Sequence, residues 1–107
     1  MTYEDRVLDA LGDRTRRKVF QRLRGGARSV GEIAHGMDVS RPAVSQHLRV
    51  LKGARLVKYR REGTRRLYAV DNKGIETLRD WLDGFWDQTL AAFKEAAERE
   101  ATKERKP

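Results

Sequence analysis

Apolar residues recur at helical spacing in the middle of the chain. Over residues 40–56, Val44, Leu48 and Leu51 follow an i, i+4, i+7 spacing, which predicts a helix with one buried stripe. The polar side chains of this segment fall largely elsewhere on the helix, so they have no packing role. These side chains belong to Arg41, Ser45, Gln46, Arg49 and Lys52.

Capping signals mark shorter helices before this one. Asp13 is placed to cap a helix that runs to about residue 24, after a short first helix that stops at Gly12. Ser29 and Glu32 have the spacing of a capping box, which predicts a third helix that Gly36 ends.

The long middle helix has its own entrance signal. Ser40 is placed to cap it, and Pro42 is tolerated because first-turn N–H groups have no intrahelical partner. Two helices joined by a tight glycine-containing turn form a helix-turn-helix, whose second helix enters the DNA major groove. The polar face of residues 40–56 is therefore predicted to face DNA.

The next segment, LVKYRREGTRRLYAV, alternates as two strands around Glu62-Gly63-Thr64, which predicts a hairpin. A helix-turn-helix followed by a basic hairpin is a winged helix, so the predicted fold is mainly α with a small β-hairpin. The tip is suited to contact phosphates or to enter a narrow minor groove, the alternative being a solvated hairpin with protective edge charges. Its predicted DNA contacts are Arg60, Arg61, Thr64, Arg65 and Arg66.

A last helix is predicted over about residues 72–100, capped by Asp71 or Asn72. Residues 1–107 are predicted to form a single domain, in which the tail, residues 101–107, frays. At ~42 Å the last helix is longer than the body of so small a domain. Part of its aromatic stripe is therefore predicted to be buried in a homodimer, with burial by another protein as the alternative. The predicted interface residues are Val7, Leu8, Leu78, Trp81, Leu82, Phe85, Trp86, Thr89 and Phe93.

Charge is concentrated in the same part of the chain. The 107 residues carry a net charge of +8, and residues 41–66 contain nine Lys or Arg against Glu62 alone, which accounts for the whole surplus. Such a segment is typical of a surface that binds a polyanion. No apolar run approaches the ~20 residues of a membrane-spanning helix, and the acidic start lacks a signal-peptide pattern, so we expect a cytoplasmic protein.

The residues that carry chemistry elsewhere form no site in this sequence. Cysteine is absent, which excludes disulfides, thiolate metal sites and thiol redox sensing. Ser45 and His47 are two positions apart on a helix and do not face each other, so they are not a catalytic pair. Three aspartates share one side of the last helix, where a solvated face is expected instead of a cation site. We expect no enzymatic activity, no cofactor and no metal.

Three strings, LGDRTRRKVFQRL, VGEIAHGMDVSRPAVSQHLRVLKGARLV and REGTRRLYAV, resemble the ArsR/SmtB family of winged-helix repressors over roughly residues 3–95. The resemblance implies four helices, two strands and a final helix, in a homodimer that binds an inverted-repeat operator and represses transcription until a signal releases it. It also implies a wing over residues 61–66. By position, the DNA-reading stretch then holds Ser40, Arg41, Pro42, Ser45, Gln46 and His47.

Metal-sensing members of that family carry cysteines on the third helix, or histidine and acidic ligands on the last helix. This chain has no cysteine and no histidine after His47, so it resembles a metal-independent branch. The predicted function is sequence-specific repression. The predicted base contacts are Arg41, Ser45, Gln46 and Arg49, and phosphates are assigned to Ser40, His47, Lys52 and the wing arginines. The alternatives are a nonspecific DNA- or RNA-binding module, or an adaptor that uses the aromatic helix.

Overall fold

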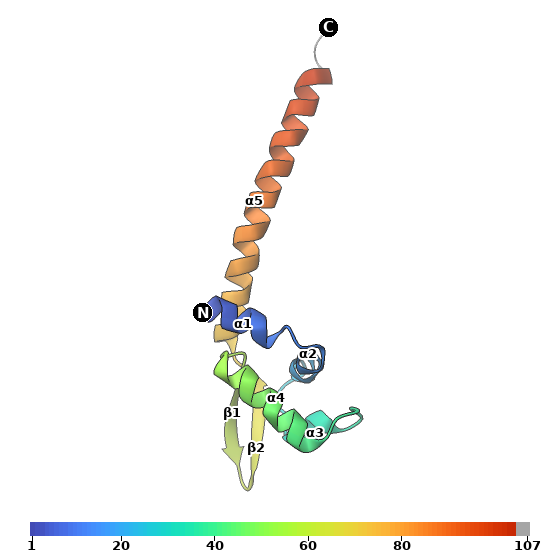
Figure 1. The fold of residues 1–107 in the computed structure, drawn as a ribbon, viewed down its shortest axis with the longest axis vertical. Helices are drawn as coiled ribbons and strands as arrows, with labels where there is room; N and C mark the ends of the chain where they lie inside the picture. The colour runs from blue at the N-terminus through green and yellow to red at the C-terminus, as the bar shows by residue number, and fades with distance from the viewer. Residues whose placement is uncertain (105–107) are drawn as a thin grey trace.

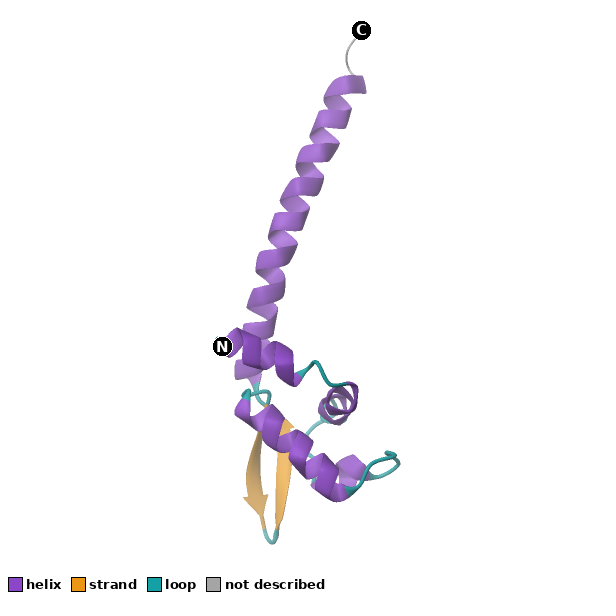
Figure 2. Cartoon of the chain, in the orientation of Figure 1, coloured by secondary structure: helices purple, strands orange, loops and turns teal. Residues whose placement is uncertain are grey.

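The computed structural model describes residues 1–104. Within them the chain forms five helices and one antiparallel hairpin, in the order of a winged helix-turn-helix, which confirms the predicted fold class (Figure 1; Figure 2). The elements are α1 (Tyr3–Ala10), α2 (Arg14–Gln21), α3 (Val30–Ala34), α4 (Arg41–Gly53), β1 (Val57–Glu62), β2 (Arg65–Val70) and α5 (Asn72–Glu104).

The predicted caps begin the helices as expected. Asp13 and Ser40 each accept a first-turn N–H, at 2.9 and 3.2 Å, and Ser29 and Glu32 form a complete capping box. Of the two candidate caps for α5, Asp71 accepts the N–H of the second helical residue at 3.0 Å. A capping box between Thr2 and Asp5, which the sequence reading missed, starts α1 at Tyr3.

Helix α2 ends at Gln21, earlier than the predicted end near residue 24, because the chain turns there before its two glycines. Arginines of this region hold the ends of neighbouring helices. Arg16 and Arg17 donate to the carbonyls of Ala10 and Leu11 at the end of α1, and Arg22 donates to the carbonyl of His35 after α3. Guanidinium groups at these ends satisfy carbonyls that have no partner within their own helix. These three arginines therefore have structural roles.

The core lies where α1, α2, α3 and α4 meet the base of the hairpin. Its fully buried side chains include Val19, Ile33, Leu48 and Leu51. Val7 belongs to the same core and is only 1% exposed, so its predicted place in a dimer interface is wrong. The helical spacing in α1 identified an apolar face correctly, but this residue is already covered within its own subunit.

The hairpin pairs Val57 with Val70 at its base and Glu62 with Arg65 at its tip. Gly63 has a φ of +64°, a left-handed conformation that glycine adopts without steric penalty, and it lies in the turn. The segment before α3 is attached to this hairpin, since Arg28 and Tyr68 exchange two backbone hydrogen bonds of 2.8 Å. The wing is thus tied to the start of α3 as well as to α4.

Helix α5 projects away from the other elements (Figure 1). Its 33 residues span ~50 Å, while the molecule measures 76 × 28 × 23 Å. The helix continues to Glu104, four residues beyond the predicted end near residue 100, and the fraying of the tail stays a prediction. Ala, Glu, Lys and Arg dominate this stretch and favour helix. Residues 105–107 of the predicted tail lie outside the described residues.

No helix within residues 1–104 is both long and apolar enough to cross a membrane.

Candidate nucleic-acid interface

Helix α4 buries one face and exposes the other. Val44, Leu48 and Leu51 are completely buried, whereas the polar residues predicted from the sequence are exposed. Successive residues are about 100° apart around a helix axis, so the exposed set lies beside the buried stripe and is centred roughly 100° from it. The exposed set comprises Arg41, Ser45, Gln46, Arg49 and Lys52.

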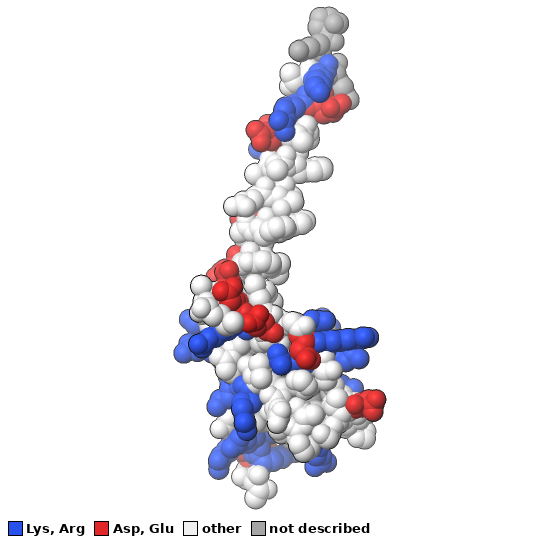
Figure 3. All heavy atoms as spheres, in the orientation of Figure 1, with Lys and Arg blue, Asp and Glu red and all other residues white. Residues whose placement is uncertain are grey.

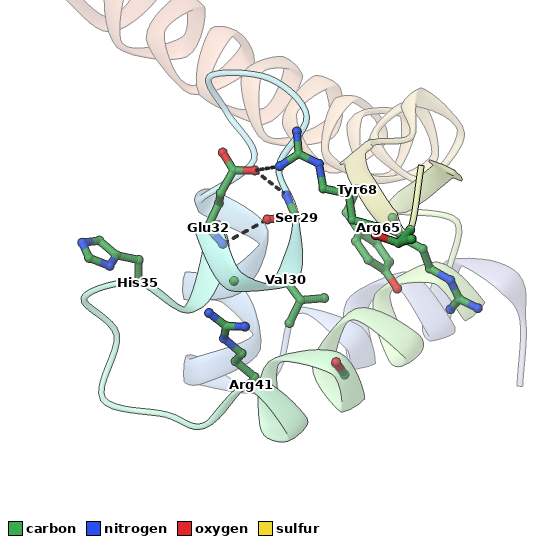
Figure 4. A pocket seen from close by; sticks show the side chains of 11 residues that line it. Ser29, Val30, Glu32, His35, Arg41, Arg65 and Tyr68 are labelled. Carbon is green, nitrogen blue, oxygen red and sulfur yellow. Dashed lines mark hydrogen bonds and ion pairs between the residues drawn. The ribbon is translucent and has the colours of Figure 1, made fainter. Parts of the chain in front are cut away.

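A depression of about 860 Å³ lies between α3, the start of α4 and the wing. Ser29 and Glu32 line it from α3, Arg41 and Ser45 from α4, and Arg65 from β2 (Figure 4). Figure 3 shows Lys and Arg side chains over the hairpin and the lower part of the molecule, whereas the middle of α5 carries few charges on the face drawn. The depression is therefore part of a basic surface.

A second depression, of about 190 Å³, lies between α4 and the hairpin. The Tyr59 ring lines it and is contacted by two cations, Lys52 Nζ at 4.7 Å and the Arg66 guanidinium at 4.6 Å from the ring centroid. The Tyr68 ring lies 5.4 Å from that of Tyr59. A hydrogen bond to Tyr68, followed by the charge interaction with Tyr59, raises the pKa of Arg66 above its ordinary value. Cation–π and aromatic contacts thus fix the wing relative to α4.

Tyr59 and Tyr68 were not among the residues selected from the sequence. The period-2 alternation of a strand places Tyr59 on the same side as the buried Val57. The sequence therefore held a signal that Tyr59 faces the protein, although not that it binds Lys52 and Arg66.

The wing arginines are exposed and form weak ion pairs. Arg60 lies 3.7 Å from Glu62, and Arg65 lies 3.9 Å from Glu62 and 3.6 Å from Glu32. All these side chains are more than half exposed, and exposed pairs contribute little to stability. Arg61, also exposed, lies opposite Arg66 in the hairpin. Their guanidinium groups remain accessible to an anionic partner.

The structure brings many of the predicted DNA contacts together, but not all of them. The residues that line one or both depressions are Arg41, Ser45, Arg49, Lys52, Thr64, Arg65 and Arg66. Ser40, Pro42 and Gln46 are exposed on the first turns of α4 without lining either depression, and Arg60 and Arg61 lie along β1.

His47 occupies a different position from the other predicted contacts. It is half-buried and lies near enough to Asp13 to contribute to lowering the pKa of that carboxyl, after the larger effect of the Arg16 backbone N–H. Because Asp13 caps α2, His47 lies near the start of α2.

The aromatic stripe of α5 is uncovered in the single chain. Trp81, Phe85, Trp86 and Phe93 are 38%, 62%, 57% and 73% exposed. Leu82 is 48% exposed, whereas Leu8 and Leu78 are half-buried against the subunit body. The Thr89 hydroxyl donates to the Phe85 carbonyl at 2.9 Å, so it needs no polar partner across an interface. Such a contiguous apolar surface is typical of a protein interface.

No group of three or more His, Asp or Glu residues within residues 1–104 is arranged to hold a metal ion. The independence from metals stays a prediction.

The exposed face of α4, the tethered wing and the basic surface between them define a winged helix-turn-helix DNA-binding protein. A family described as a helix-turn-helix domain matches residues 11–60. The chain is 50% identical over 96 residues to the HTH-type transcriptional regulator Rv2034 of Mycobacterium tuberculosis, with 90% of each chain covered. It is 33% identical over 79 residues to the transcriptional repressor SdpR of Bacillus subtilis, with 74% of this chain and 88% of SdpR covered.

Solved structures give the same result. The homodimeric winged helix-turn-helix DNA-binding domain Mb0332 of Mycobacterium bovis, a possible ArsR-family transcriptional regulator, has 31% identity and a TM-score of 0.65, with 82% of each chain covered. The chain belongs to the ArsR/SmtB family of winged helix-turn-helix transcriptional regulators. This confirms the resemblance seen in the sequence.

Proposed function

We propose that this protein is a homodimeric repressor that binds an inverted-repeat operator through α4 and the wing. The observation that carries the proposal is the continuous basic surface formed by α4 and the hairpin, since both depressions are bordered by Ser45 and Arg66. A surface of this kind binds phosphates on both sides of a groove while a helix reaches the bases between them.

Two sets of contacts follow from the positions on α4. Arg41, Ser45, Gln46 and Arg49 are assigned to base edges, because they lie on the exposed side of the helix within its first three turns. Lys52 and the wing arginines are assigned to phosphates. Ser40 remains a helix cap whose position at the helix N-terminus also suits a phosphate. His47 is half-buried near Asp13, so we assign it a phosphate contact at the edge of this surface.

Dimerisation is assigned to α5. The uncovered stripe of Trp81, Phe85, Trp86 and Phe93 provides a large apolar surface, and the homodimeric state of the similar Mycobacterium bovis domain supports the same arrangement. A two-fold dimer places two reading helices about one DNA turn apart, ~34 Å, which matches an inverted repeat. One short helix per subunit then gains affinity from the second.

The experiment is selection of bound sequences from a random DNA pool, followed by footprinting and by mass measurement of the protein in solution. An inverted repeat protected by a dimer is the expected result. Equal binding to selected and scrambled DNA would favour the nonspecific module, and a monomer with no affinity for DNA would favour the adaptor. In either case the repressor assignment would be wrong.

We further propose that the protein has no enzymatic activity and that its release from DNA does not depend on a metal. The family consists of DNA-binding regulators. The residues that line the two depressions include no arrangement of nucleophile, base and orienting group within the described part of the chain.

A further inference from the structure

One carboxylate lines the larger depression of the basic surface, while Glu62, 3.9 Å from Arg65, lies near the wing tip outside that lining. Glu32 lines the larger depression together with Arg41, Arg65 and Arg66 (Figure 4). Among the side chains of residues 1–104 that line this depression, Glu32 alone is acidic. Glu32 caps α3 from this position, and its negative charge among groups assigned to phosphates opposes the binding of DNA.

The Glu32 carboxylate is held in place by α3 itself. Its Oε1 atom accepts the backbone N–H of Ser29 at 3.1 Å, while the Glu32 N–H donates to the Ser29 hydroxyl at 3.2 Å. These contacts with the Ser29 backbone and side chain, followed by the charge of Arg65, lower the pKa of Glu32 below its ordinary value of 4.5. The group is therefore ionised at neutral pH.

The same oxygen atom also contacts the wing. Glu32 Oε1 lies 3.6 Å from an Arg65 guanidinium nitrogen, and Figure 4 shows the carboxylate between Ser29 and Arg65. A carboxylate oxygen and a phosphate oxygen are equivalent acceptors for guanidinium. In the free protein Glu32 thus occupies the place at Arg65 that a DNA phosphate oxygen would take.

The strength of this pair decides what it does. The two side chains are 53% and 56% exposed, and pairs of that kind contribute little because water and salt screen them. The pair is too weak to be needed for holding the wing, which the Tyr59 contacts and the Arg28–Tyr68 bridge already fix. When a phosphate binds Arg65, however, the guanidinium must leave the carboxylate, and the Glu32 charge then faces that phosphate in a site with less water, where like charges repel more strongly.

We propose that Glu32 is an intramolecular competitor of DNA for Arg65, and that it lowers the affinity of this regulator for every DNA sequence. The inference rests on the proposed function, because it assumes that Arg65 meets phosphate. Because Glu32 acts on a contact with the DNA phosphate backbone, it lowers the affinity for operator and for nonspecific DNA alike and leaves the ratio of the two affinities unchanged. Its effect is to keep nonspecific binding weak while the base contacts of α4 select the operator.

The variant that tests this is Glu32→Gln. Glutamine preserves the capping box, since its side-chain oxygen also accepts the Ser29 N–H, but it removes the charge. We expect binding to operator and to scrambled DNA to tighten by about threefold to tenfold at low salt. The slope of log affinity against log salt should steepen by up to about one unit, because Arg65, no longer paired with a carboxylate, then displaces a further cation from the DNA.

Two controls accompany it. Glu98→Gln makes the same change in net charge on an exposed part of α5 outside both depressions, and it should shift affinity by less than about twofold. In an Arg65→Ala background, the gain from Glu32→Gln should shrink to less than half of its value on a logarithmic scale, as competition for Arg65 requires. Thermal unfolding of each variant verifies that the fold is retained.

The outcomes separate the two proposals. Failure of the wild-type protein to bind any selected DNA contradicts the proposed function itself. If the wild type binds its operator but Glu32→Gln binds equally or more weakly, Glu32 preorganises Arg65 or acts only as a cap, and the competitor role is wrong. An equal gain in the Arg65→Ala background, or from Glu98→Gln, would reduce the effect to general charge and would equally overturn the inference.

Discussion

The junction between the DNA-binding body and α5 depends on a glycine. The Gly74 N–H donates to the Arg55 carbonyl at 2.8 Å, and Arg55 itself has a φ of +56° in the tight turn after α4. A Cβ atom on Gly74 would lie 2.6 Å from the Arg55 carbonyl oxygen and 2.8 Å from Leu56 Cδ2. Both distances are far below van der Waals contact, and the first partner is backbone. The substitution Gly74→Ala must therefore displace α5 or the turn.

The magnitude follows from three contributions to the free energy of unfolding. Overpacking of a tight site costs ~1–3 kcal/mol, and weakening of the Gly74–Arg55 hydrogen bond costs ~1 kcal/mol more. Alanine is favoured over glycine in a helix by ~1 kcal/mol, which offsets the second contribution. The net expectation is a loss of ~1–3 kcal/mol, or a fall in Tm of roughly 4–20 °C for a domain of this size.

Gly84→Ala is the matched control, because nothing lies within 4 Å of a Cβ built on this exposed glycine of α5. It should raise the free energy of unfolding by up to ~1 kcal/mol. Thermal unfolding followed by circular dichroism, at one fixed protein concentration because a dimer is expected, measures both variants. If Gly74→Ala is as stable as the wild type or more stable, the described docking of α5 against residues 55–56 is wrong.

Four further predictions concern function and pH. Changing Arg65 and Arg66 together to alanine should weaken binding to all DNA sequences and flatten the salt slope by about one unit per lost contact; an unchanged slope would remove the wing from the interface. Gln46→Ala should weaken operator binding by ~1–3 kcal/mol and leave nonspecific binding nearly intact. Equal losses of affinity for operator and for scrambled DNA would show that Gln46 contacts the DNA backbone instead of a base. Zinc, copper, arsenite, chelators and thiol oxidants should leave operator binding unchanged in a fluorescence-anisotropy titration; a stoichiometric shift of about tenfold would falsify the assignment to the metal-independent branch. The hydrogen bond from the Arg16 backbone N–H lowers the pKa of Asp13 below 3.8 in the folded protein. The ionised carboxylate therefore stabilises the fold at pH values above the pKa of Asp13 in the unfolded chain. This stabilisation is lost as the pH falls through the pKa of Asp13 in the folded protein. Asp13→Asn keeps the cap without the charge, so the free energy of unfolding of this variant should fall less steeply than that of the wild type between about pH 5 and pH 3. A parallel fall for the two proteins would contradict a stabilising role of the Asp13 charge.

Features that depend on neighbouring residues in the chain were predictable from the sequence. The caps at Asp13, Ser29 and Ser40, the glycine turn of the hairpin and the two faces of α4 all follow from local spacing. The match of these signals to one winged-helix order made the fold class predictable as well.

Features that depend on packing between distant segments were not predictable. Val7 has the spacing of an interface residue, yet the elements around α1 cover it completely. Glu32 was recognised only as a cap, because its second contact is with Arg65, which lies 33 positions later in the sequence. The contacts of Tyr59 with Lys52 and Arg66 likewise require α4 and both strands to be in place.

Strand β2 ends at Val70 and helix α5 begins at Asn72, so Asp71 alone separates the wing from the long helix. The N–H of Asp71 donates to the Leu56 carbonyl at 2.9 Å, which fixes this single-residue connection to the turn after α4. If two subunits pair through α5, the angle at which the helices cross sets the distance between the two wings. Half-site spacing is then encoded in the aromatic residues of α5, and base preference in the polar residues of α4. Evolution can change the spacing of an operator and its sequence through separate sets of mutations.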